Sequence, residues 1–191
     1  MAPRKVRVGI LLSGRGSNMT ALVEASRDPA CPYEVVLVAS DKPAAPGLAW
    51  AMDQGIATWS LSPKGIGKPA YEAALQTALR DAQVETISLA GYMRLVSDTF
   101  VAAWRGGILN IHPSLLPKYK GLDTHARAIA AGDPVGGCSV HIVTEELDGG
   151  EVLGQSEVAI VPGDTAETLA ARVLEAEHRL YPRILAEFVA R

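Results

Sequence analysis

The chain has 191 residues, of which 48% are hydrophobic and 20% are charged, a composition that is ordinary for a globular protein of one domain. Its formal net charge of −3 argues against a broad basic surface for nucleic acid, but it is compatible with a local site for a small anion. The apolar run near the N-terminus, residues 8–12, is too short to cross a membrane and has no cleavage site after it, so we expect neither membrane association nor export.

Apolar runs alternate with helical patterns over the first 111 residues. The pattern predicts strands at 6–12, 33–39, 56–61, 84–90 and 107–111. It also predicts a first helix through Met19, Leu22 and Val23 that Ser17 or Asn18 caps, and helices over 47–54 and 68–82. Because the strands are mostly apolar and do not alternate cleanly, they are typical of a parallel sheet that is covered on both faces. We therefore predict a doubly wound α/β fold.

The rhythm changes near residue 137. Two strands joined by the loop 145–150 are expected to pair antiparallel. A long C-terminal helix follows, with Asp164 or Thr165 as its cap and Glu167 in its first turn. The whole prediction is one domain over 1–191, with a mostly parallel Rossmann-like sheet, an antiparallel C-terminal part and a long C-terminal helix.

The stretch NIHPSLLP, residues 110–117, is the most informative one. Asn110 and His112 alternate at the end of a buried strand, so they point to the same face, and Pro113 ends regular pairing. In open α/β sheets that edge binds ligands. Amide and imidazole N–H groups can both donate to an oxygen that becomes negative during acyl transfer. The alternative is a strand end with two hydrogen-bonded polar residues.

The loop between the first strand and the first helix, residues 11–18, has the features of an anion site. Gly14 and Gly16 allow close approach of a ligand, the helix N-terminus offers free N–H groups, and Arg15 adds charge. A phosphate is the expected guest, and a tight turn with a helix cap is the alternative. A dinucleotide fingerprint is disfavoured because Met19 stands where it needs glycine, and Asp41 after the second strand is interpreted as a turn residue.

No spacing of histidines or cysteines suits a metal. The residues concerned are Cys31, His112, His125, Cys138, His141 and His178. Without a disulfide framework the two cysteines favour a reducing compartment, which is the cytoplasm. We expect His141 to be a packed strand residue and His125 to begin a helix. Asp148 is either a turn aspartate or, if it lies beside His112, an acid partner that holds the ring in its charged form.

Five segments together resemble the folate-dependent formyltransferases. They are SGRGSN (13–18), LAGYMR (89–94), LNIHPSLLPKYKG (109–121), ELDGG (146–150) and EAEH (175–178). The run around His112 with the distant Asp148 is highly specific for that superfamily. The phosphate loop narrows the similarity to the branch that formylates glycinamide ribonucleotide in purine biosynthesis.

The resemblance implies direct transfer of a formyl group from 10-formyltetrahydrofolate to the amine of 5'-phosphoribosylglycinamide, without a metal. Asn110 and protonated His112 would stabilise the negative oxygen, and Asp148 would keep His112 charged. The implied contacts are Arg15, Gly16, Ser17, Asn18 and Glu177 for phosphoribosylglycinamide, and Lys68, Met93, Arg94, Leu95, Val96 and Asn110 for folate. Residues 1–100 would form the phosphate-binding half and 101–191 the folate and catalytic half.

Some of these residues could have a purely structural role, and two differ from the residue that is usual in the family. Met93 and Leu95 would also suit a packed core, and Glu177 a solvated helix surface. Asp123 stands where many members have histidine, and Lys68 where arginine is frequent. Only small-molecule partners are expected, with the protein a monomer or a homodimer.

Three other functions compete with this one. A formyltetrahydrofolate hydrolase would share the histidine and aspartate, but we expect no room for its N-terminal regulatory domain. A methionyl-tRNA formyltransferase would need a basic surface and a second domain. A nucleotide-binding module without catalysis would use the glycine loop but would not need Asn110, His112 and Asp148 together.

Overall fold

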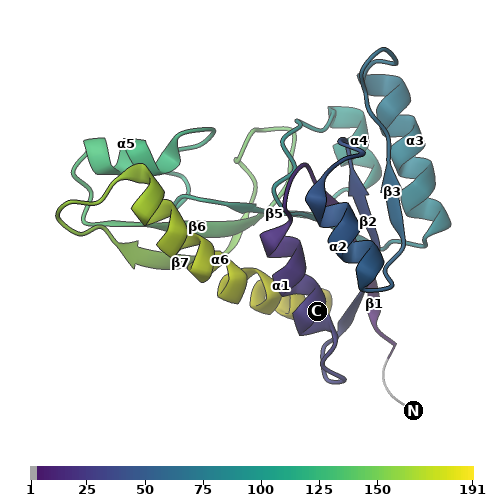
Figure 1. Cartoon of the computed structure of the whole chain (residues 1–191), viewed down its shortest axis with the longest axis horizontal. Coiled ribbons are helices and arrows are strands. Elements are labelled where there is room, and N and C mark those ends of the chain that lie inside the picture. The colour runs from purple at the N-terminus through teal and green to yellow at the C-terminus, as the bar shows by residue number, and fades with distance from the viewer. Residues whose placement is uncertain (1–3) are drawn as a thin grey trace.

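The computed structural model describes residues 4–191 as alternating strands and helices that become antiparallel near the C-terminus (Figure 1). The order is β1 (Val6–Leu12), α1 (Ser17–Ser26), β2 (Tyr33–Ser40), α2 (Pro46–Asp53), β3 (Thr58–Ser60), α3 (Lys68–Asp81), β4 (Thr86–Leu89), α4 (Asp98–Ala103), β5 (Ile108–His112), α5 (Thr124–Ala130), β6 (Val135–Ile142), β7 (Val152–Ala159) and α6 (Ala166–Val189).

One seven-stranded sheet runs through the described residues in the order β3-β2-β1-β4-β5-β6-β7. The strands from β3 to β5 are parallel, whereas β6 pairs antiparallel with both β5 and β7. The predicted doubly wound, mostly parallel fold with an antiparallel C-terminal part is confirmed. The chain reverses its winding between β1 and β4, which is where open α/β sheets bind their ligands.

Helices cover both faces of the sheet. One core joins α1, α2 and α6 to the sheet, and its fully buried members include Leu12, Met19 and Tyr181. The other joins α3 and α4 to the opposite face through Tyr71, Leu75 and Phe100. Figure 1 shows α6 running from the antiparallel strands to the side of α1, so the C-terminal helix connects the two ends of the sheet.

Most element boundaries agree with the pattern of the sequence. The C-terminal helix is capped as expected: Thr165 Oγ1 accepts from the backbone N–H of Thr168 at 3.3 Å, and Glu167 lies in the first turn. The predicted cap of α1 is wrong. Gly16 is the N-cap, and no side chain caps the helix. The φ of Gly16 is 74°, a backbone conformation that glycine adopts without strain.

Helix α4 is not predicted by the sequence pattern, because six residues span less than two turns and show little periodicity. Ser97 Oγ begins it by accepting from the backbone N–H of Phe100 at 3.1 Å. Over residues 4–191, no helix combines the length and the apolar character that crossing a bilayer requires.

Candidate active site

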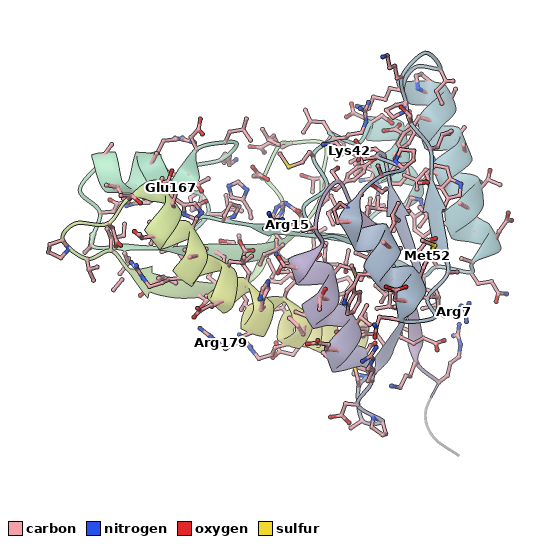
Figure 2. The ribbon with its side chains drawn as sticks, in the orientation of Figure 1. Arg7, Arg15, Lys42, Met52, Glu167 and Arg179 are labelled. Carbon is pink, nitrogen blue, oxygen red and sulfur yellow. The ribbon has the colours of Figure 1, made fainter. Side chains whose placement is uncertain are left out.

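Two loops and the end of a strand meet at the carboxyl edge of the parallel strands. The loop after β1 carries Gly14 to Asn18, the loop after β4 carries Met93 to Val96, and β5 ends at His112. Since β1, β4 and β5 are neighbours in the sheet, the predicted phosphate loop, folate loop and catalytic pair share one edge. Figure 2 shows Arg15 at the N-terminal end of α1, on this side of the molecule.

Asn110 and His112 lie on one face of β5. Their neighbours Leu109 and Ile111 belong to the core beneath α1 and α6, so the two polar side chains point to the opposite face. His112 is buried, with 5% of its surface exposed. The side-chain direction that the sequence predicts is therefore confirmed, and the strand ends before Pro113, as expected.

Both ring nitrogens of His112 face an acceptor. Nε2 lies 2.9 Å from the carbonyl oxygen of Tyr119, and Nδ1 lies 3.4 Å from Oδ2 of Asp148. A neutral ring carries only one N–H and can satisfy one of these acceptors, whereas the charged ring donates to both. Both contacts can therefore be hydrogen bonds at the same time only when the ring carries two N–H groups.

Asp148 is a partner of His112 and not a plain turn residue. Its side chain is 7% exposed, and Oδ2 also accepts from the backbone N–H of Gly121 at 2.9 Å. Burial alone would raise the pKa of this carboxyl, but hydrogen bonds from His141 and Gly121 together with the charge of His112 outweigh it and lower the pKa. The site therefore holds Asp148 as a carboxylate.

His141 belongs to this cluster, so the interpretation of it as a packed strand residue is incomplete. It lies opposite Asn110 in the antiparallel pairing of β5 and β6. Its Nε2 is 3.2 Å from Nδ2 of Asn110 and 3.5 Å from Oδ1 of Asp148, while Nδ1 is 3.0 Å from the carbonyl of Ile142. Nε2 of His141 thus lies between the amide and the carboxylate, a position that only the strand register reveals.

In the predicted phosphate loop the start of α1 is accessible to solvent, whereas the Asn18 side chain is already hydrogen-bonded within the protein. Arg15 is exposed, and Gly16 and Ser17 are partly exposed at the start of α1. Asn18 is buried, and its Nδ2 donates to Oε2 of Glu177 at 2.7 Å. An anion here would therefore meet the N–H groups and the positive end of the α1 dipole, with Arg15 nearby, but not the Asn18 amide.

Glu177 is a buried carboxyl and not a solvated helix residue. It lies on α6 with 7% of its surface exposed, and burial raises its pKa to about 7, although the hydrogen bond from Asn18 opposes this. Oδ1 of Asn18 has no hydrogen-bond partner within the described part of the chain. A buried acceptor beside the phosphate loop is thus left without a donor, as is common at a ligand-binding site.

The predicted folate loop presents apolar side chains to solvent. Met93 is 69% exposed and Leu95 is 67% exposed, so packing in the core does not explain them. Arg94 lies with its Cζ 5.6 Å from the centre of the Tyr71 ring. Lys68 is the first residue of α3 and is partly exposed, and Val96 is also partly exposed. Exposed apolar groups beside polar ones suit a flat aromatic ligand.

Two further predictions concern histidine and metal. His125 is the second residue of α5, close to its predicted role at a helix start. Asp123 precedes that helix with a φ of 56° and makes no side-chain cap. Among residues 4–191, no three His, Cys, Asp or Glu side chains gather in a way that would hold a metal ion.

Fold and site together define an enzyme of the doubly wound α/β class with an amide, an imidazole and a carboxylate at its ligand-binding edge. A family model described as formyl transferase matches residues 6–185, and the chain belongs to this family. The resemblance in the sequence motifs is therefore confirmed.

Its relatives include single enzymes and parts of longer proteins. A phosphoribosylglycinamide formyltransferase of Escherichia coli K12 is 41% identical over 184 residues, which cover 96% of this chain and 87% of that one. A solved structure of a phosphoribosylglycinamide formyltransferase from Brucella melitensis superposes with a TM-score of 0.94 at 53% identity, covering 98% and 97% of the two chains. The trifunctional purine biosynthetic protein adenosine-3 of Gallus gallus is 45% identical over 95% of this chain, which spans only 18% of that protein.

Proposed function

We propose that the chain transfers a formyl group from 10-formyltetrahydrofolate to the amine of 5'-phosphoribosylglycinamide, a step of purine biosynthesis. The names of the Escherichia coli and Brucella melitensis relatives support this acceptor. The main support for the proposal is the cluster of Asn110, His112 and Asp148 at the carboxyl edge that also carries the phosphate loop and the folate loop.

The chemistry needs stabilisation of one oxygen and movement of one proton. The amine of the glycinamide attacks the formyl carbon and forms a C–N bond, so negative charge collects on the formyl oxygen. The bond to N10 of the folate then breaks, and the proton that the amine loses goes to N10. Asn110 Nδ2 and a His112 N–H are the donors to the oxygen, and removal of one such donor typically costs about 10²-fold or more in rate.

His112 must release one of its present acceptors to meet the formyl oxygen. The contact with Asp148 is to a carboxylate, so it is the stronger of the two and the one we expect to be kept. The bond to the Tyr119 carbonyl is to a neutral acceptor and is the one we expect the substrate to replace. Asp148 also accepts from Gly121 and therefore keeps its place during the exchange.

Both halves of the chain contribute to each proposed substrate site. The phosphoribosyl site combines the loop after β1 with Glu177 of α6, and the folate site combines Met93 to Val96 with Asn110. Holding two substrates at one edge turns a bimolecular step into a local one, which lowers the entropic part of the barrier. The exposed Met93 and Leu95 would bind the pterin.

The test is to measure transfer to competing acceptors. Purified protein with 10-formyltetrahydrofolate is given phosphoribosylglycinamide, water alone or initiator tRNA, and formylated product and free formate are quantified. We expect formylated ribonucleotide with little formate. Mainly formate would identify a hydrolase, formylated tRNA would identify the tRNA enzyme, and no product from any acceptor would refute a role in formyl transfer.

A further inference from the structure

Ser13 and Asp41 lie outside the proposed substrate contacts but join three loops of the site. Ser13 follows β1 and Asp41 follows β2, and they are 4% and 7% exposed. Ser13 Oγ donates to Oδ1 of Asp41 at 2.6 Å. The same Oγ accepts from the backbone N–H of Met93 at 2.9 Å. One hydroxyl thus connects the ends of β1 and β2 with the loop after β4.

The direction of these bonds matters. Because its hydrogen points to the Asp41 carboxylate, the Ser13 hydroxyl has its lone pairs free for the Met93 N–H. A hydroxyl that donates to a carboxylate is also a better acceptor, since hydrogen bonds in a chain polarise one another. Asp41 therefore acts on Met93 through Ser13, and the interpretation of Asp41 as a plain turn residue is incomplete.

Side chains of the segment that Ser13 holds contact α3, where Tyr92 OH donates to Tyr71 OH at 3.0 Å and Arg94 lies over the Tyr71 ring. The two ends of the segment are fixed by other bonds, from Ser13 N–H to the Gly91 carbonyl at 3.0 Å and from the Ser97 N–H to Glu72 at 2.8 Å. Between them Met93 and Leu95 project into solvent and gain nothing from the core. The bond from the Met93 N–H to Ser13 thus acts directly on the backbone under the exposed apolar side chains.

We propose that Ser13 and Asp41 are positioning residues that hold the Met93 backbone in the conformation that binds the folate co-substrate. This inference rests on the proposed function, because it assumes that the loop after β4 binds folate. It predicts that loss of the Ser13 hydroxyl weakens the folate site and leaves the phosphate loop backbone in place. The bond from Ser13 N–H to Gly91 does not involve the side chain, so Ser13→Ala should fold.

Ser13→Ala tests the proposal with Ser40→Ala as a matched control. Ser40 is likewise a buried serine at a strand end, but its Oγ accepts from the Lys42 N–H of its own turn, at 3.0 Å, and not from another loop of the described residues. Hydrogen exchange of the Met93 amide is the first readout: we expect protection to be lost in Ser13→Ala and kept in Ser40→Ala. We further expect the KM for 10-formyltetrahydrofolate to rise about ten-fold in Ser13→Ala, the effect of one orphaned buried group, with the KM for phosphoribosylglycinamide nearly unchanged.

Variants of Asp41 show whether Asp41 acts as the hydrogen-bond acceptor for Ser13 or through its negative charge. Asp41→Asn keeps an oxygen that accepts from Ser13, so we expect protection and folate KM close to wild type. Asp41→Ala frees the hydroxyl to rotate, and we expect values between those of wild type and Ser13→Ala. This variant also serves if Ser13→Ala does not fold.

The outcomes also separate this inference from the proposed function. Retained Met93 protection in Ser13→Ala, or lost protection with an unchanged folate KM, would overturn the positioning role, as would an equal rise in both KM values. If the wild type shows no transfer, the Kd of 10-formyltetrahydrofolate replaces KM, and an equal Kd in wild type and Ser13→Ala would overturn the inference by itself.

Discussion

Glu177→Gln should stabilise the protein at alkaline pH while impairing substrate binding. The carboxyl of Glu177 is buried on α6 and accepts a hydrogen bond from Asn18 at 2.7 Å, and within residues 4–191 it forms no ion pair that would balance its charge. Glutamine has nearly the same shape and an oxygen that can still accept from Asn18. The substitution therefore removes the charge and little else.

The size and the pH range of the effect follow from the pKa. Burial raises the pKa of Glu177 from an ordinary 4.5 to about 7, a difference that corresponds to about 3 kcal/mol. Between these values the folded protein keeps a proton that the unfolded chain has lost. The stability that this proton contributes is full below pH 4.5 and is lost as pH rises through about 7. Glu177→Gln removes this loss.

Urea unfolding of both proteins at several pH values measures the effect. The free energy of unfolding of Glu177→Gln minus that of wild type should increase by up to about 3 kcal/mol between acid pH and pH 8. Glu175→Gln is the matched control, because Glu175 is an exposed carboxyl of the same helix, and its difference from wild type should stay flat. A flat difference for Glu177→Gln as well would refute the reasoning. If Glu177 binds substrate, the same variant should show a higher KM for phosphoribosylglycinamide despite its added stability.

Three further substitutions test the proposed site. His112→Asn should fold normally and lower the rate of formyl transfer by about 10²-fold or more, and steady-state kinetics with wild-type turnover would sink the assignment of His112. Gly16→Val should weaken binding of the phosphorylated substrate and spare folate, because a Cβ at this positive φ would lie 2.8 Å from the Met19 side chain. Titration of each ligand checks this, and equal loss of both affinities would indicate misfolding. Asp148→Asn should shift the pH–rate profile and lower stability at neutral pH. The reason is that the lowered pKa of Asp148 contributes stability that is present above its ordinary pKa of 3.8 and is lost as pH falls further. Unfolding midpoints that differ equally from wild type at all pH values would contradict this prediction.

The parts of the fold that the sequence predicts are those set by local pattern. A central strand such as β1 is mostly apolar because both of its faces are covered, and the helix over Lys68–Asp81 shows its buried stripe directly. Helix α4 lacks that signal because of its length. The N-cap of α1 is Gly16, whose positive φ is not visible in the sequence. Ser17 and Asn18 next to it are residue types that commonly cap helices, and they therefore misled the prediction.

The parts of the site that the sequence leaves open depend on distant contacts. Asn18 and Glu177 are 159 residues apart, and no local pattern indicates that they share a hydrogen bond. His141 reaches Asn110 only through the register of β5 and β6. Asp148 is placed by the loop between two antiparallel strands and by Gly121, so its contact with His112 needed the folded chain.

A single-turnover experiment with 10-formyltetrahydrofolate labelled in its formyl carbon tests the central claim most directly. Enzyme in excess is mixed with labelled folate and phosphoribosylglycinamide, quenched at intervals, and the label is followed in folate, ribonucleotide and formate. We expect the label to pass from folate to the ribonucleotide amine without free formate, and to leave the folate about 10²-fold more slowly or slower still in Asn110→Ala and His112→Asn. Label that appears first as formate, or that moves at the wild-type rate in both variants, would contradict this claim.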